Sequence, residues 1–316
     1  MKHTTFLLLL SAVLAADVSA PIVGYSVQAA RREVRVILGV PGSTHYSEPL
    51  AWPAEAASVR VTPGHRWLLA LRGEDASASV WIPESGVEHS LAKVSGEPGL
   101  IAISPSGAAV AFYWREAQRL VVYAGLPDAP VLAADFRTGD WASLAIGNSG
   151  RLVAGQSESG ELRLILRDAE PMEKLVREAR AVASYGFVGD DNTLAIVEPG
   201  SDRVELIGGV RDGSFTRRLL QLPAASTSSA RLISGGVGWF SLVDPDGGVM
   251  YRLELTGSVR AAALAGIPVS AFESLRSRGA TLLLPSPDDD TPPRIVLSHA
   301  AGDDLFYLPT LAKEQE

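Results

Sequence analysis

Short apolar stretches separated by polar turns recur along the chain at a nearly constant interval. Each turn contains Gly or Asn and is followed by an apolar stretch that predicts a strand, and successive turns lie 42–44 residues apart. The turns are centred on Gly64, Gly107, Gly150, Asn192, Gly236 and Gly279. A further step of 43 residues back from Gly64 reaches Pro21, so the segment 21–316 holds about seven periods. The pattern predicts a repeat protein.

Each period contains the same succession of predicted strands. In the unit around Gly107 we expect strands at 100–103, 110–113 and 120–124 and a weaker fourth strand at 131–136. Third strands alternate apolar and polar residues, whereas second strands are continuously apolar, as expected of strands covered on both faces. The segment 170–181 has a helical pattern at the place of a fourth strand, and we expect a distorted strand or one helical turn there.

Four strands every 40–45 residues are typical of a β-propeller, in which each sheet packs against its two neighbours. We therefore predict an all-β chain that forms one seven-bladed propeller domain of four-stranded repeats over residues 21–316. An open solenoid would need capping units at its ends, and the sequence shows none, which favours a closed ring. The first unit starts at its second strand, so we expect one blade to have three strands or to borrow an inner strand from 310–316.

One turn resembles a known repeat. Ser104-Pro105-Ser106-Gly107 and its flanking hairpin are similar to the SPDG-type repeats of TolB-like and WD40-like propellers. The resemblance extends over the whole segment from Pro21 at the level of the fold, and no recurring Gly-His and Trp-Asp signature accompanies it. It implies a propeller and no particular activity.

Residues 1–20 have the composition of a secretory signal peptide. Lys2 precedes a mainly apolar stretch of eleven residues, Phe6–Ala16, and small residues follow it. This stretch is too short for a membrane span, which needs about twenty residues. The candidate cleavage sites follow Ala15, Ala16 and Ala20, although Pro21 is a poor residue directly after a cleavage site. We predict a bacterial protein, periplasmic or secreted, without a membrane span.

Composition narrows the classes of partner. The net charge of −8 disfavours nucleic acids and anionic membranes, because phosphate groups would be repelled. The absence of Cys excludes disulfides, thiolate catalysis and zinc–thiolate sites. We expect a monomer whose partner is a protein or a small polar ligand.

Motifs of known catalytic chemistry are scarce. The five histidines, at positions 3, 45, 65, 89 and 299, include no pair with metal-ligand spacing. Ser90-Leu91-Ala92-Lys93 has the S-x-x-K spacing of penicillin-recognising enzymes, but the S-D-N and K-T-G elements of that chemistry are missing. Among six tryptophans, Trp67 and Trp239 are predicted in the core. Trp141 follows a loop and is a candidate either for packing or for contact with a sugar or peptide.

Two acidic turns are candidate Ca²⁺-binding sites. Asp244-Pro245-Asp246-Gly247-Gly248 and Pro287-Asp288-Asp289-Asp290 offer oxygen ligands, but neither continues into a complete calcium loop. Asp and Gly are also the residues that tight turns require for backbone reasons. We predict no metal and no cofactor.

The loops between second and third strands are the most acidic part of the chain. They lie on one face of a propeller together with the loops between blades, and they contain twelve acidic residues against Arg31, Arg32 and Arg115. The acidic residues are Glu33, Glu74, Asp75, Glu116, Glu158, Glu198, Asp202, Asp244, Asp246, Asp288, Asp289 and Asp290. We expect a ligand-binding acidic rim that faces a cationic or Ca²⁺-bridged partner. The alternative is a solvated ring of turns that keeps the protein soluble.

Two functions remain open. The first is a non-catalytic binding or scaffold propeller that uses its loop face. The second is a metal-dependent hydrolase similar to the sugar-lactone hydrolases, which hold a divalent ion at the channel mouth. Asn, a ligand in such sites, occurs only at 148 and 192, in turns of the opposite face. The first interpretation is therefore favoured, with no catalytic residue assigned.

Overall fold

The computed structural model describes residues 20–40, 42–73, 77–167, 171–178, 180–189, 191–236, 238–264, 271–274, 280–284, 294–299 and 302–307. The predicted signal peptide, apart from Ala20, lies outside these residues. In the described part, the elements are β-strands and two short 3₁₀ helices, η1 (Ala29–Arg31) and η2 (Pro63–His65). No helix among the described residues is long and apolar enough to cross a membrane.

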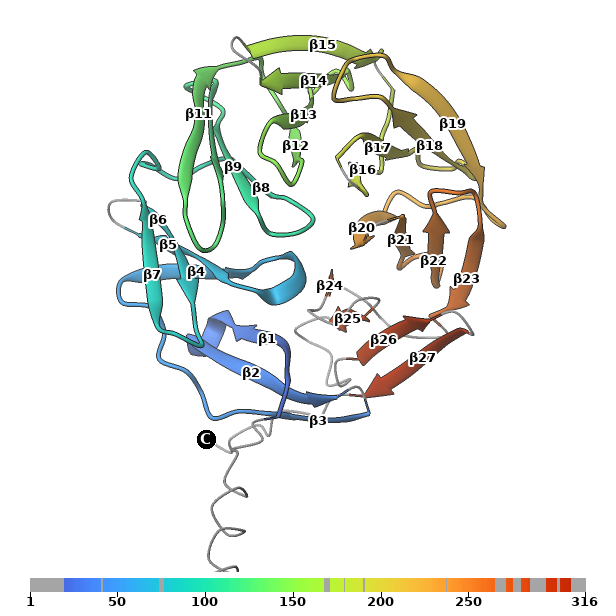
Figure 1. Cartoon of the computed structure of the whole chain (residues 1–316). Coiled ribbons are helices and arrows are strands. Elements are labelled where there is room, and N and C mark those ends of the chain that lie inside the picture. Colours follow the sequence, from blue (N-terminus) through green and yellow to red (C-terminus); the bar gives the residue numbers. More distant parts are fainter. Residues whose placement is uncertain are drawn as a thin grey trace, which may run out of the picture.

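The strands form antiparallel sheets that stand around a central axis (Figure 1). Neighbours in the chain pair with each other, and the first strand of each four-stranded sheet lies innermost. The first sheet holds β1 (Ile22–Gln28), β2 (Glu33–Val40) and β3 (Ser43–Tyr46). The next three sheets are β4 (Ala56–Val61), β5 (Leu68–Arg72), β6 (Ala78–Ile82) and β7 (Val87–Leu91); β8 (Leu100–Ile103), β9 (Ala109–Trp114), β10 (Arg119–Ala124) and β11 (Val131–Arg137); and β12 (Ser143–Ile146), β13 (Leu152–Gln156), β14 (Leu162–Arg167) and β15 (Pro171–Arg177). The last three are β16 (Ser184–Val188), β17 (Thr193–Val197), β18 (Arg203–Gly208) and β19 (Thr216–Gln221); β20 (Arg231–Gly236), β21 (Trp239–Asp244), β22 (Val249–Glu254) and β23 (Val259–Ala263); and β24 (Ala271–Ser274), β25 (Ala280–Leu284), β26 (Arg294–His299) and β27 (Gly302–Tyr307).

The prediction of an all-β propeller with four-stranded repeats is confirmed, but the number of blades is corrected. Among the described residues, six blades have four strands, instead of the seven predicted, and the sheet β1–β3 has three strands. Its strand β1 occupies the position of a second strand, one period before β5. The segment 170–181, which has a helical pattern, contains the strand β15, whose pairing with β14 shifts register between Leu162 and Arg163.

Among the described residues, η2 and no strand covers the inner edge of β1; the segment 310–316, predicted as a possible inner strand, lies outside them. This 3₁₀ turn contacts both β1 and β24. The buried His65 imidazole accepts a hydrogen bond at Nδ1 from the backbone N–H of Tyr25, with an N···N distance of 2.9 Å. An edge strand leaves backbone donors without ladder partners, and here a side chain of the next sheet satisfies one of them.

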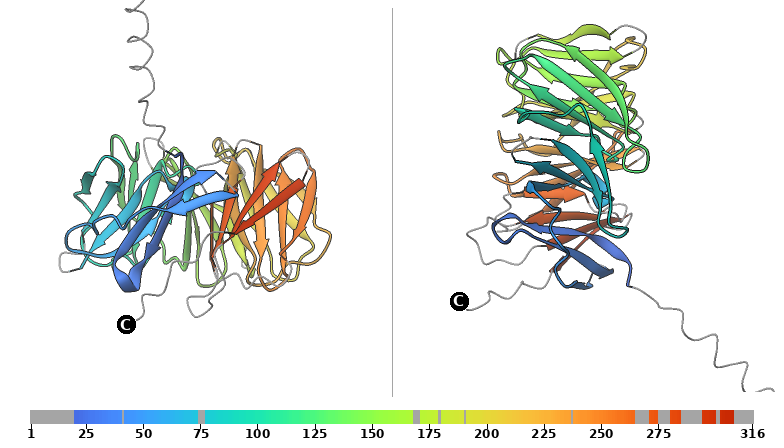
Figure 2. Two further views of the ribbon diagram at one scale, coloured as in Figure 1. Left: turned by 90° about the horizontal axis from the view of Figure 1, so that it is seen from below. Right: turned by 90° about the vertical axis from the view of Figure 1, so that its left-hand side faces the viewer.

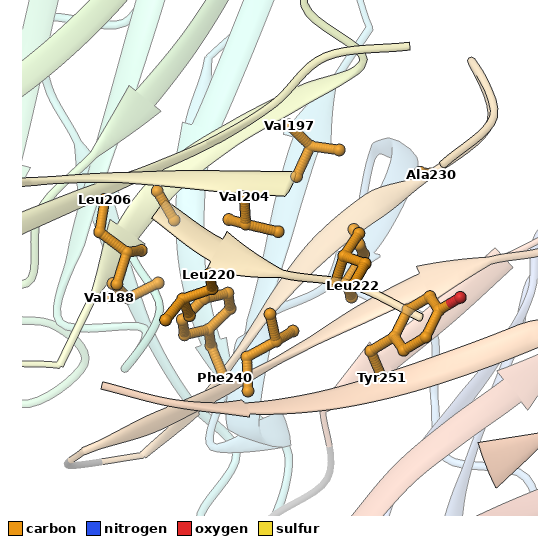
Figure 3. Close-up of a cluster of buried hydrophobic side chains, with 12 residues drawn as sticks. Val188, Val197, Val204, Leu206, Leu220, Leu222, Ala230, Phe240 and Tyr251 are labelled. Carbon is orange, nitrogen blue, oxygen red and sulfur yellow. The ribbon is translucent and has the colours of Figure 1, made fainter. Parts of the chain in front are cut away.

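Apolar side chains fill the spaces between adjacent sheets. Between β16–β19 and β20–β23, the side chains of Val204, Leu220, Phe240 and Tyr251 belong to one buried cluster (Figure 3). Trp141 packs so closely on β13 that a Cβ on Gly155 would lie 2.2 Å from its ring. Trp141 is 1% exposed, so the candidate contact with a sugar or peptide does not apply to this side chain.

The two ends of the ring are built from different connections (Figure 2). The turn face carries the connections between first and second strands and between third and fourth strands. Its turns are linked from blade to blade: the Ser106 N–H donates to Asn148 Oδ1 at 2.7 Å, and the Ser149 N–H donates to Asp191 Oδ2 at 2.8 Å. Asn148 therefore has a structural role. The loop face carries the connections between second and third strands and between blades.

Candidate functional site

The structure describes some, but not all, of the residues predicted to form the acidic rim. Glu116, Glu158, Asp202 and Asp246 are exposed on the loop face. Glu74, Asp75, Asp288, Asp289 and Asp290 lie outside the described residues. The four exposed acids come from four different sheets, in loops that are spread around the ring.

Asp244 is not part of an exposed rim. It is 1% exposed, and its carboxylate accepts hydrogen bonds from the backbone N–H groups of Thr227 at 2.7 Å and Gly247 at 3.1 Å. The hydroxyl groups of Thr227 and Ser229 also donate to it. The carboxylate thus closes its own turn and holds the preceding loop, which is the backbone role that Asp has in tight turns.

Two of the four exposed acids are paired. Glu158 forms an ion pair with Arg115 of the neighbouring sheet, whose Nη1 donates to Oε1 at an N···O distance of 2.7 Å. Asp202 lies 3.6 Å from Arg203 Nε and accepts a hydrogen bond at 2.7 Å from the Gln221 amide. Glu116 and Asp246 form no ion pair with another described residue. The charge of the rim is therefore smaller than the loop sequences alone suggest.

A cavity of about 410 Å³ occupies the centre of the ring. Its described lining comes from inner strands and turns, is mostly aliphatic, and includes Ile103, Leu144, Ile146 and Ile233 but no charged side chain. The phenol of Tyr185 also lines it. This hydroxyl group is 2.9 Å from Ser143 Oγ and accepts from the Gln156 N–H at 3.1 Å. Burial raises the pKa of Tyr185, so the hydroxyl group stays protonated. The channel as described offers no general acid or base for neutral pH.

The part of the chain that the structure describes contains no group of three or more His, Asp or Glu residues that could hold a metal ion. A hydrolase of the metal-dependent kind needs such a group at the channel mouth. The described residues thus provide no geometry that favours this alternative.

A second cavity, of about 550 Å³, opens between the sheets β12–β15 and β16–β19. We call it the interblade groove. Its lining comes from β15 and the segment that follows it, from the end of β17 and the loop after it, and from β18 and β19. The lining residues are Leu175, Val176, Arg177, Glu178, Arg180, Ile196, Glu198, Ser201, Arg203, Glu205, Arg217 and Leu219. Because the 198–202 loop, Glu178 and Arg180 belong to the loop face, the groove lies on that face.

The floor of the groove is an ion-pair network around Arg177. The Arg177 side chain is 9% exposed and contacts the carboxylates of Glu198 and Glu205, the latter at 3.8 Å. Arg217 pairs with Glu205 at 2.8 Å and donates to the Val176 carbonyl oxygen at 2.8 Å. Burial lowers the pKa of Arg177, and the Glu205 carboxylate opposes this effect. The network joins the end of β15 to β18 and β19.

The mouth of the groove combines cations with aliphatic side chains. Arg180, Arg203 and Arg217 are 69%, 55% and 54% exposed, whereas Glu198 and Glu205 are 34% and 16% exposed. Leu175 and Leu219, which are 49% and 55% exposed, lie on the outer strands of the two sheets. This surface was not predicted from the sequence. The alternation of residues along β18 and β19 could have indicated it. Arg203 and Glu205 share one face of β18, and Arg217 and Leu219 share one face of β19.

Comparison with known proteins shows similarity in fold. No protein-family model matches the sequence, and no curated protein matches it. Among solved structures, a protein of unknown function from Desulfotomaculum acetoxidans has a TM-score of 0.59 at 9% identity, and the match covers 92% of this chain and 100% of that one. PorZ of Porphyromonas gingivalis, an essential bacterial surface component of the type-IX secretion system, has a TM-score of 0.58 at 12% identity. That match covers 92% of this chain and 39% of PorZ.

A streptogramin B lyase has a TM-score of 0.54 at 13% identity, with 82% of this chain and 86% of the lyase covered. At these identities the similarity concerns the fold, and the three proteins differ in what their names say about function. The chain is a β-propeller and resembles these proteins, like the TolB-like and WD40-like propellers, at the level of the fold.

Proposed function

We propose that this protein is an exported, non-catalytic propeller that binds a partner protein on its loop face. The observation that carries the proposal is the contrast between its two cavities. The channel is lined by aliphatic residues and a phenol engaged in hydrogen bonds, whereas four arginines and three glutamates line the interblade groove. Arg and aliphatic side chains that surround a groove suit recognition better than bond cleavage.

The signal-peptide pattern of residues 1–20 supports export. The fold itself assigns no activity, since propellers support unrelated functions and the site must decide between them. Of the similar proteins, PorZ is described as a surface component of a secretion system and another is a lyase. The first of these roles is compatible with an exported scaffold.

The exposed acids of the loop face form a second contact in this proposal. Glu116 and Asp246 are exposed and without an ion pair among the described residues, so they are available to basic groups or to a bridging Ca²⁺ ion. The partner would then carry both acidic and basic groups. Such complementarity gives specificity and faster association rather than high affinity by itself.

Site-directed photo-crosslinking in the native cells tests the proposal. A photoreactive residue replaces Leu219 at the mouth of the groove in one variant. In a matched variant it replaces Gly186, which lines the channel and has open space at its Cβ position. We expect a discrete protein adduct from position 219 and none from position 186. Adducts from position 186 alone, or from neither position, would overturn the proposed function.

A further inference from the structure

We propose that the interblade groove binds an extended acidic segment of the partner and inserts an aliphatic side chain of that segment between Leu175 and Leu219. This inference rests on the proposed function and adds the chemistry of the ligand. Three independent features of the groove lead to it: its outermost charges, the internal pairing of its carboxylates and the position of its two leucines.

The outermost charges of the groove are mainly positive. A ligand that approaches from solvent first meets the guanidinium groups of Arg180, Arg203 and Arg217, each more than half exposed, and the exposed Glu178. Four arginines against three glutamates give the lining an excess of one positive charge, in a chain whose net charge is −8. Guanidinium groups bind carboxylates with paired, directional hydrogen bonds.

The carboxylates at the floor do not oppose an anionic ligand strongly, because they are already neutralised. Glu205 lies between Arg177 and Arg217, and Glu198 lies between Arg177 and Arg180. Arg177 is nine-tenths buried, and its Nη1 has no hydrogen-bond partner among the described residues. Positive charge therefore remains at the floor beneath the exposed arginines. Arg177 acts as a positioning residue that holds Glu198 and Glu205 away from the mouth.

The aliphatic part of the ligand follows from the outer strands. Leu175 on β15 and Leu219 on β19 line the groove and leave about half of their surface in water. Burial of such side chains by a partner is favourable at about 25 cal/mol per Å². A nucleic acid lacks aliphatic side chains and would be repelled by the rest of this acidic chain. The combination of charge and apolar surface fits an acidic peptide.

The ligand chemistry can be tested with synthetic peptides and the purified protein. The probe is a fluorescent peptide of alternating Glu and Leu, and the comparison peptides replace Leu by Ser or Glu by Lys. Fluorescence anisotropy at low and high salt measures affinity. We expect the Glu-Leu peptide to bind, to weaken as salt rises, and to bind more tightly than both comparison peptides.

Two pairs of variants place the binding in the groove. The double variant Arg180→Glu and Arg203→Glu should weaken binding about tenfold or more, while Arg137→Glu with Arg211→Glu, at exposed positions elsewhere, should not. Likewise Leu219→Ser should weaken binding, and Val131→Ser, an exposed position on β11, should not. Circular dichroism verifies that each variant is folded.

Equal losses in the groove and control variants, or tighter binding of the Lys-Leu peptide, would overturn the inference. The outcomes also separate the two proposals. Crosslinking at position 219 without binding of the Glu-Leu peptide would leave the proposed function intact and refute the acidic ligand. An absence of adducts at position 219 would refute the proposed function itself.

Discussion

At the residue scale, the inner edge of β1, which pairs with no other described strand, depends on the His65 imidazole. Nδ1 accepts the Tyr25 N–H, and both residues are fully buried. His65 has a φ of 50°, a left-handed conformation that is uncommon for residues other than Gly, although His adopts it more often than most. The hydrogen bond and the packing of η2 against β1 and β24 compensate for this conformation.

We expect His65→Ala to destabilise the ring by about 1–3 kcal/mol, because it leaves a buried backbone donor without its acceptor. His89→Ala, on the outer strand β7 and only half-buried, is the matched control and should change stability little. Chemical denaturation of both variants measures the difference. Similar losses in the two variants would show that His65 is not the acceptor on which the edge depends.

Gly155 is a second position where a single added carbon atom would disturb the packing of a neighbouring side chain. A Cβ there would overlap the ring of the buried Trp141, whereas a Cβ at Gly186 would meet no atom within 4 Å. We expect Gly155→Ala to destabilise the protein by about 1–3 kcal/mol or more through overpacking, and Gly186→Ala to be tolerated. Thermal melting compares them. A fully stable Gly155→Ala variant would contradict this packing of Trp141.

At the element scale, strands of neighbouring blades are joined by charges as well as by apolar cores. The Arg177 network connects β15 with β18 and β19. Removal of one partner from a buried network leaves the others uncompensated. Arg177→Met should therefore cost about 3 kcal/mol, and Glu205→Gln added to it should recover part of the loss. A double-mutant cycle measures this coupling, and strict additivity would contradict it.

Within one blade, Arg119 on β10 binds Asp135 on β11 through two contacts of 2.8 Å. The hydrogen bond from Arg119 lowers the pKa of Asp135 below its usual value. The folded state thus binds this proton more weakly than the unfolded state, so the pair stabilises the protein above the unfolded pKa of about 4 and loses this effect as pH falls through the lowered pKa.

Because both side chains are about one-third exposed, we expect Asp135→Asn to cost only about 0.2–1 kcal/mol near neutral pH. The two proteins should become equally stable in acid, below the pKa of Asp135. Unfolding free energies at a series of pH values test this. A difference that persists or grows in acid would exclude the pair as its source.

At the scale of the whole molecule, the ring depends on the contacts of its last sheet on both sides. The turn η2 contacts β24, and β20 contacts β24 from the other side. A chain that ends at residue 270 would expose sheet faces and edges that are otherwise covered. We expect it to aggregate or to lose cooperative unfolding in calorimetry. A monomer that melts cooperatively would instead indicate an open array of independent units.

The sequence predicts the architecture well because the period of 42–44 residues follows from repeated turns, which are local features. It does not predict how β1 is covered, because the His65–Tyr25 bond joins residues 40 positions apart. The same limit applies to the candidate site. Loop composition suggests a uniform acidic rim, but Asp244 is buried and Glu198 is bound by arginines from another blade. The interblade groove arises only when β15 and β19 are placed side by side.

The central claim is that the protein binds a partner with its interblade groove and not with its channel. Amide hydrogen exchange, measured by mass spectrometry, tests this claim directly. It compares the free propeller with its complex with the partner protein that the crosslink at position 219 identifies. We predict slower exchange on binding in β15, in the loop 198–202 and in β19, with no change in the channel strands β8 and β12. Protection of β8, β12 and β16 without protection of β15 and β19 would contradict the account.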